Sequence, residues 1–275
     1  KSLSLQQAKG SANRGSLDLT LSGGIEELPA LNGINFKVKA TGKELAQIGP
    51  LVGAELPELG PFDASAKLSG SAKAILLSPF SANIDKSDFK GLVKVEVRKR
   101  PKITAHLESS VVDFTTLMKT LEKDEQKPAS KDKQKHRLFS DEAQPFDVLK
   151  KVDADILMKA RNIHAKDARL EFGHLTLKLQ DGDFSIDRLE ATYRQTKISG
   201  NLHINSSSPS QVATKFIVQG LNLGDLLKET GVSDQVRANL DIAAHLKSRG
   251  DSVYSLMANL DGSIGAVMGE GYLTR

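Results

Sequence analysis

Residues 93–98 read Val-Lys-Val-Glu-Val-Arg, and this short stretch decides the fold class of the chain. Val93, Val95 and Val97 alternate with charged residues. A period of two places successive side chains on opposite faces of a β-strand. One apolar and one charged face predict a strand in an antiparallel sheet whose second face contacts water.

The same alternation recurs along the chain. Further runs in the first half span residues 17–21, 36–40 and 103–107. In the second half the alternating apolar residues are Leu175, Leu177, Leu179, Phe184, Ile186, Ile198, Leu202, Ile204, Phe216, Val218, Leu240, Ile242, Ala244 and Leu246. Clusters rich in Gly, Ser, Asp or Pro, which are typical of turns, separate these runs at residues 22–24, 181–183, 206–209, 248–251 and 261–262. Connections this short favour antiparallel neighbours.

Helical spacing of apolar residues is confined to four short segments, at residues 45–52, 114–121, 223–227 and 253–260. Asp251 or Ser252 is a suitable N-cap for the last of them. The sequence therefore predicts a mainly β protein, an antiparallel, elongated and strongly twisted open sheet or groove with a few short amphipathic helices (α+β by strict count).

A charged segment divides the chain. Residues 122–140 are rich in Lys, Asp and Glu and almost free of apolar residues, which predicts a disordered loop between a first unit, 1–121, and a second, 141–275. The tripeptide Pro-Phe-Asp occurs at 61–63 and again at 145–147, each time between a helical segment and a strand run, which favours an internal repeat. The charged segment 122–140 has two interpretations. The favoured one is a surface insertion, and the other is a basic segment that attracts anionic lipid headgroups.

Composition narrows the class of protein. The 275 residues are 39% hydrophobic and 5% aromatic, with no Trp, so the core must be built from aliphatic side chains. A net charge of +4 gives little support for nucleic-acid binding. The absence of Cys excludes disulfides and thiolate metal sites. No apolar run reaches the ~18 residues of a membrane span. We expect a piece of a longer protein, because the chain starts at Lys1 without Met.

Motifs of catalysis are missing from the sequence. It contains no phosphate-binding loop, no nucleophile elbow and no paired histidines at metal-ligand spacing. Asp181, Asp183 and Asp187 do not match the spacing of an EF-hand calcium loop. We therefore expect a protein that is not an enzyme and has neither a cofactor nor a metal site.

Several stretches together resemble a known family. Residues 139–269 are similar to the C-terminal part of AsmA family proteins. The likeness is carried by Pro-Phe-Asp at 145–147 with Lys-Val-Asp-Ala-Asp at 151–155, by Gly-Leu-Asn-Leu-Gly-Asp-Leu-Leu at 220–227, and by Met-Ala-Asn-Leu-Asp-Gly-Ser-Ile at 257–264. The first half, with Glu-Leu-Gly-Pro-Phe at 58–62, is similar to the preceding repeat of that family. The family belongs to the AsmA/TamB-like, repeating β-groove lipid-transfer superfamily.

The resemblance implies a location and a ligand. It implies a periplasmic protein of Gram-negative bacteria, held to the inner membrane by an anchor outside this chain. Its ligand would be phospholipid or other lipid acyl chains bound along an apolar β groove, and its role would be to support outer-membrane assembly or integrity. The candidate groove residues are Val93, Val95, Val97, Ile103, Leu107, Leu175, Leu177, Leu179, Leu202, Phe216 and Val218.

Two other functions remain open from the residues alone. One is a structural or assembly scaffold of the cell envelope, whose apolar faces would pack together as a closed, dry β core. The other is an envelope hydrolase or glycan-processing enzyme, which would need a clustered acid, base or metal that the sequence does not display.

Overall fold

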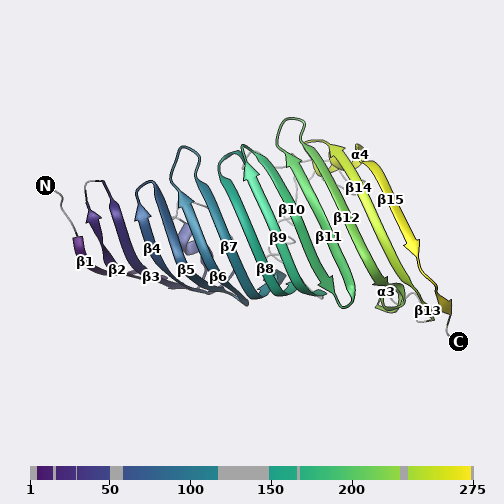
Figure 1. Cartoon of the computed structure of the whole chain (residues 1–275), viewed down its shortest axis with the longest axis horizontal. Helices are drawn as coiled ribbons and strands as arrows, with labels where there is room; N and C mark the ends of the chain where they lie inside the picture. Colours follow the sequence, from purple (N-terminus) through teal and green to yellow (C-terminus); the bar gives the residue numbers. More distant parts are fainter. Residues whose placement is uncertain are drawn as a thin grey trace, which may run out of the picture. The chain divides into compact units, whose positions relative to one another are not determined.

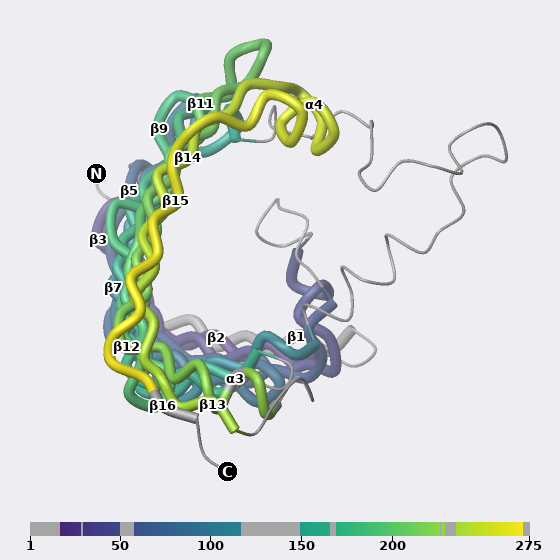
Figure 2. The backbone as a smooth tube through the Cα atoms, turned by 90° about the vertical axis from the view of Figure 1, so that its right-hand side faces the viewer, coloured from purple at the N-terminus to yellow at the C-terminus, as the bar shows by residue number. Residues whose placement is uncertain are grey.

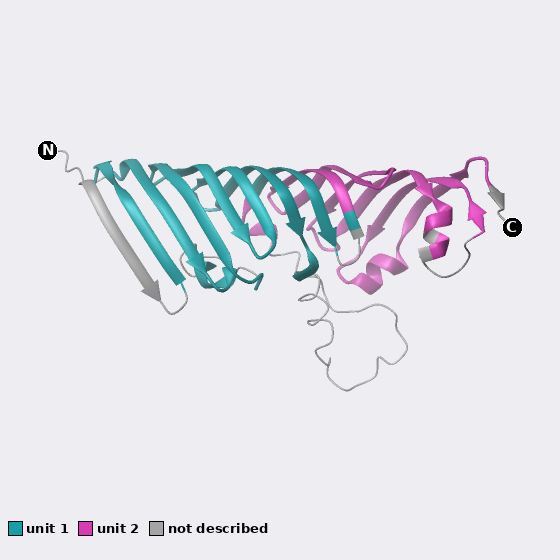
Figure 3. Ribbon diagram, turned by 90° about the horizontal axis from the view of Figure 1, so that it is seen from below, with its two compact units in different colours: residues 1–132, 154–169 teal, residues 133–153, 170–275 magenta. Residues whose placement is uncertain are grey.

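The structure is a computed structural model that describes residues 5–14, 17–28, 30–49, 58–116, 149–165, 168–229 and 235–273. The chain divides into two compact units, which Figure 3 colours separately. Unit 1 comprises residues 1–132 and 154–169, and unit 2 comprises residues 133–153 and 170–275.

Unit 1 is a sheet in which each strand pairs with the next one along the chain (Figure 1). Its strands are β1 (Leu5–Arg14), β2 (Leu17–Glu27), β3 (Asn32–Gly42), β4 (Phe62–Ser71), β5 (Ala74–Ile84), β6 (Ser87–Glu96), β7 (Lys102–Asp113) and β8 (Asp153–Ala165). The ladders from β1 to β7 are antiparallel. A short 3-10 helix, η1 (Leu45–Ile48), follows β3.

Unit 2 repeats this up-and-down arrangement. Its strands pair antiparallel in the order β9 (Ala168–Gln180), β10 (Asp183–Tyr193), β11 (Thr196–Asn205), β12 (Gln211–Asn222), β14 (Asn239–Arg249) and β15 (Asp261–Met268). A two-residue strand β13 (Val236–Arg237) pairs with β16 (Tyr272–Leu273). Figure 2 shows α4 (Val253–Ala258) at one end of the strands of unit 2 and α3 (Leu223–Glu229) at the other, and both helices contact β14.

The mainly β, antiparallel open sheet predicted from the alternation is confirmed. The predicted turns at 181–183 and 206–209 are also confirmed, since they connect β9 to β10 and β11 to β12. Two predicted turns are wrong, because residues 22–24 lie inside β2 and residues 261–262 inside β15. In these strands glycine allows neighbouring backbones to approach closely and does not form a turn. A Cβ on Gly23 would collide with the carbonyl oxygen of Asn35 on the next strand, so glycine permits a close backbone approach.

Two predicted helices are confirmed, as α3 and α4. Of the segment 45–52, residues 45–48 form the 3-10 turn η1, Gly49 is helical, and the remainder lies outside the described residues. Most of segment 114–121, the charged segment 122–140 and the second Pro-Phe-Asp lie outside the described residues.

Ser252 is the N-cap of α4. Its hydroxyl accepts a hydrogen bond from the backbone N–H of Ser255 at 3.1 Å, and the Ser255 hydroxyl accepts one in return from the Ser252 backbone N–H at 3.0 Å. Such a capping box satisfies two backbone donors that the helix leaves unpaired. We expect Ser252→Ala to lower the free energy of unfolding by about 1 kcal/mol, as urea denaturation would measure. Ser207→Ala, at an exposed turn position, should change it by much less.

Asp88 joins the beginning of β6 to the end of β7. Its Oδ1 accepts backbone hydrogen bonds from Val111 at 2.7 Å and Ser110 at 2.9 Å. Burial raises the pKa of Asp88, but these bonds outweigh that effect and hold the pKa below its ordinary value. The ionised carboxylate is therefore the form that stabilises the folded sheet.

The Asp88 bonds predict a pH dependence of stability. Because the folded pKa is the lower one, the stabilisation is present above the ordinary carboxyl value of about 4 and is lost as pH falls through the folded pKa. Asp88→Asn should cost about 1 kcal/mol at pH 7, a modest value because the group is partly exposed. The difference between the two proteins should shrink toward pH 2 in urea titrations. A difference that is constant with pH would contradict this origin.

Candidate functional site

The strand register gathers the apolar side chains of unit 1 on one face. Residues directly opposite each other on neighbouring strands share a face. The apolar face of unit 1 consists of four such rows: Leu19–Ala40–Ala64–Ala82–Phe89, Leu21–Val38–Ala66–Phe80–Gly91–Leu107, Gly23–Phe36–Leu68–Leu77–Val93–Ala105 and Ile25–Ile34–Gly70–Ile75–Val95–Ile103. The rows continue from β2 to β6 or β7, so the face is apolar along the strands and across them.

Unit 2 has an apolar face of the same kind. Its rows are Leu179–Phe184–Ile204–Val212–Ser248, Leu177–Ile186–Leu202–Thr214–Leu246–Gly262, Leu175–Leu189–Gly200–Phe216–Ala244–Ile264 and Ala191–Ile198–Val218–Ile242–Ala266. Only Ser248 and Thr214 bring a hydroxyl into these rows.

These apolar faces are not the inside of a closed core. Among the described residues no large side chain is fully buried, and most of the Leu, Ile and Val residues in the apolar rows stay partly exposed. Each long strand makes most of its contacts with the strands to which it is hydrogen-bonded. A two-layer sandwich would bury its Leu, Ile and Phe side chains between the sheets. The open sheet therefore contradicts the closed β core of the alternative prediction.

Short elements cover the ends of the apolar faces. In unit 1 a Cβ on Gly42 would meet the ring of Phe62 at 2.5 Å and the side chain of Gln47, in η1, at 3.0 Å. In unit 2 the hydroxyl of Ser248 donates to the carbonyl oxygen of Leu256 in α4. The short helices η1 and α4 thus contact residues at the ends of strands.

The candidate groove residues fall into two groups. Val93, Val95, Ile103 and Leu107 lie together on the apolar face of unit 1. On the apolar face of unit 2 lie Leu175, Leu177, Leu179, Leu202, Phe216 and Val218. Val97 lies apart, since it follows the end of β6 and its side chain is 54% exposed.

Other residues of the apolar faces were not among the candidates. Ala64, Ala66 and Leu68 of β4 and Phe80 of β5 occupy central places in the rows. The alternation of residues 62–68, Phe-Asp-Ala-Ser-Ala-Lys-Leu, is the signal that could have found β4. Alanine and serine weaken this signal because they differ little in hydrophobicity.

The opposite face of each unit is charged. On it Lys94 pairs with Glu96 at 2.6 Å in unit 1, and Lys178 pairs with Asp187 at 2.7 Å in unit 2. The hydrogen bond from Lys94 lowers the pKa of Glu96, and that from Lys178 lowers the pKa of Asp187. Both carboxylates therefore keep their charge at neutral pH, and this face stays wet.

Within the described ranges, no three His, Asp or Glu side chains gather in a way that could hold a metal ion. None of the helices there combines the length and apolar character that crossing a membrane requires.

Comparisons with known proteins identify the family of the chain. The family model described as "AsmA family" matches residues 12–274. The AsmA family protein YhjG of Escherichia coli K12 is 22% identical over 281 residues. This alignment covers 95% of the present chain but 41% of YhjG, so the chain spans about two fifths of that relative's length. No solved structure matched. Since the family match extends over nearly all of the sequence, the chain belongs to the AsmA family.

Proposed function

We propose that this chain binds phospholipid or other lipid acyl chains on the apolar faces of its units. In the intact protein this binding serves lipid transport that supports outer-membrane assembly or integrity. The observation that carries the proposal is the combination of in-register apolar rows with side chains that stay half-exposed. A monomeric soluble protein rarely leaves so continuous an apolar surface uncovered unless something binds there.

The energetics favour an acyl chain as ligand. Each methylene removed from water contributes about 0.8 kcal/mol, so eight methylenes laid along a row contribute roughly 6 kcal/mol. The alanines and glycines in the middle of unit 1, such as Ala66, Ala82 and Gly91, leave space above the sheet for the chain. The rows offer hardly any hydrogen-bond donors, so a headgroup would remain in water.

The cellular setting forms part of the proposal. The chain acts in the periplasm of a Gram-negative cell. It is part of a protein that is held to the inner membrane through an anchor outside these residues. It acts by binding and not by catalysis, and its partners do not include nucleic acid. Family membership supports this setting, and the function of the whole protein is proposed from it.

Lipid extraction tests the proposal. The chain is purified without detergent, and copurified phospholipid is detected by native mass spectrometry and by chloroform extraction. In a second experiment, the uptake of a fluorescent phospholipid from vesicles is measured. We expect phospholipid to copurify and saturable uptake. Purified protein without lipid and without uptake would contradict the proposal.

A further inference from the structure

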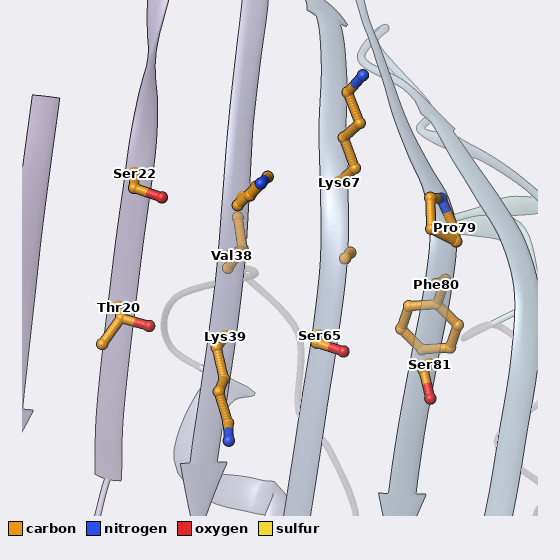
Figure 4. A pocket seen from close by; sticks show the side chains of 11 residues that line it. Thr20, Ser22, Val38, Lys39, Ser65, Lys67, Pro79, Phe80 and Ser81 are labelled. Carbon is orange, nitrogen blue, oxygen red and sulfur yellow. The ribbon is translucent and has the colours of Figure 1, made fainter. Parts of the chain in front are cut away.

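Strands β2 to β5 of unit 1 form a surface pocket of about 400 Å³, lined mostly by residues of the charged face (Figure 4). This volume falls within the roughly 300–1,000 Å³ typical of small-molecule sites. The pocket is lined by Thr20, Ser22, Lys37, Val38, Lys39, Ser65, Ala66, Lys67, Pro79, Phe80 and Ser81. No Asp or Glu is among these residues.

Two rows of side chains form the floor of this pocket. One row crosses β2 to β5 as Thr20–Lys39–Ser65–Ser81. The second runs Ser22–Lys37–Lys67 and ends at an irregularity of the ladder, where the two β5 residues 78 and 79 stand opposite the single residue Lys67. Figure 4 shows Pro79 at this place, beside Lys67, with the hydroxyls of Thr20 and Ser65 below.

Among the described residues, the lysines of the pocket outnumber their acidic partners. Lys39 pairs with Asp63 at 3.3 Å. Lys37 and Lys67 are direct cross-strand partners, and neither has an acidic partner among the residues that the structure describes. Like charges placed directly opposite each other on adjacent strands destabilise a sheet. The three lysines and Asp63 together leave two positive charges.

We propose that this pocket binds a phosphate group, bridged by the ammonium groups of Lys37 and Lys67. A dianion neutralises the two excess charges, and lysine binds phosphate as a point charge without a fixed angular requirement. The hydroxyls of Ser22 and Ser65 supply further donors from the two rows. The phosphate is either free or carried by a lipid headgroup. Most of its lining lies on the face opposite the apolar rows, although Val38, Ala66 and Phe80 of one apolar row also line it.

A binding site of this kind has a cost in stability that can be measured. Lys67→Glu replaces the repulsion between Lys67 and Lys37 by a cross-strand ion pair. The melting temperature of the ligand-free chain should therefore rise, while phosphate binding should be lost. If the two lysines did not bind phosphate, Lys67→Glu would not combine a higher melting temperature with a loss of phosphate binding.

Calorimetric titration with inorganic phosphate tests the site. The variant Lys37→Ser/Lys67→Ser should bind phosphate at least about tenfold more weakly than the unmodified chain, because two charged hydrogen bonds are removed. The matched control is Lys90→Ser/Lys94→Ser. These lysines lie on the same face and already have acidic neighbours, since Lys90 is opposite Glu108 and Lys94 pairs with Glu96. The control should bind phosphate like the unmodified chain.

A second titration, with dihexanoyl phosphatidate below its micelle concentration, identifies the source of the phosphate. Tighter binding of phosphatidate that weakens in Lys37→Ser/Lys67→Ser indicates a headgroup, and equal binding of both probes indicates free phosphate. The inference is overturned if inorganic phosphate binds the Lys37→Ser/Lys67→Ser variant as well as the unmodified chain, if it does not bind at all, or if the control variant loses binding equally. Because inorganic phosphate has no acyl chain, this result does not depend on the apolar faces.

Discussion

The double variant Val95→Asp/Leu177→Asp should lose lipid binding while its sheets stay folded. Val95 lies in a row of unit 1 and Leu177 in a row of unit 2, so the variant places a carboxylate on each apolar face. Both positions are half-exposed, and an Asp there can remain hydrated in the lipid-free protein. An acyl chain laid over the carboxylate would remove that water, at a cost of at least about 3 kcal/mol for each site. Uptake of fluorescent phospholipid should fall at least a hundredfold.

The matched control for this variant places the same charges on the opposite face. Thr104 lies opposite Lys94, and Asn201 lies opposite Lys215, so Thr104→Asp/Asn201→Asp adds two carboxylates beside lysines. Circular dichroism should show unchanged sheet content in both double variants. Equal lipid uptake by the two variants would contradict an acyl-chain site on the apolar faces.

Gly91→Ala should destabilise unit 1 more than any surface substitution. Gly91 has a φ of +146°, a conformation that residues with a side chain rarely adopt, and a Cβ there would collide with the carbonyl oxygen of His106 on β7. The strained φ and the displaced backbone should together cost about 3 kcal/mol or more of unfolding free energy. Urea denaturation followed by circular dichroism measures this loss.

Gly265→Ala is the control for the glycine prediction. Gly265 also lies in a strand, β15, but a Cβ there meets nothing within 4 Å. We expect a change of less than about 0.5 kcal/mol, because exposed sites without special geometry tolerate substitution. Equal stability of the Gly91→Ala and Gly265→Ala variants would contradict the close approach of β6 and β7.

The faces of the sheet were predictable from the sequence where bulky aliphatic residues alternate with charges. Val93 and Val95 of β6 and Leu175 and Leu177 of β9 are of this kind, and each set shares one face. Strands built from alanine and serine, such as β4, give a weaker alternation, although their backbones pair as regularly. Local pattern thus identifies a strand best when its side chains differ strongly in polarity.

Other features depend on neighbours in space and therefore could not be predicted. A glycine inside a strand looks like a turn until the partner strand shows that its backbone passes close by, as at Gly23. The irregularity beside Pro79 and the resulting lysine pocket follow from the register of β3, β4 and β5, which short-range spacing does not specify. Val97 continues the alternation of β6, but the strand ends at Glu96.

The most direct test of the central claim is the pattern of lipid cross-linking along β6. A photo-reactive benzophenone amino acid is introduced singly at Leu92, Val93, Lys94 and Val95, and each protein is irradiated after incubation with radiolabelled phospholipid. Because alternate residues lie on opposite faces, the account predicts labelling from Val93 and Val95 and none from Leu92 and Lys94. Labelling of equal strength at all four positions, or at none of them, would contradict it.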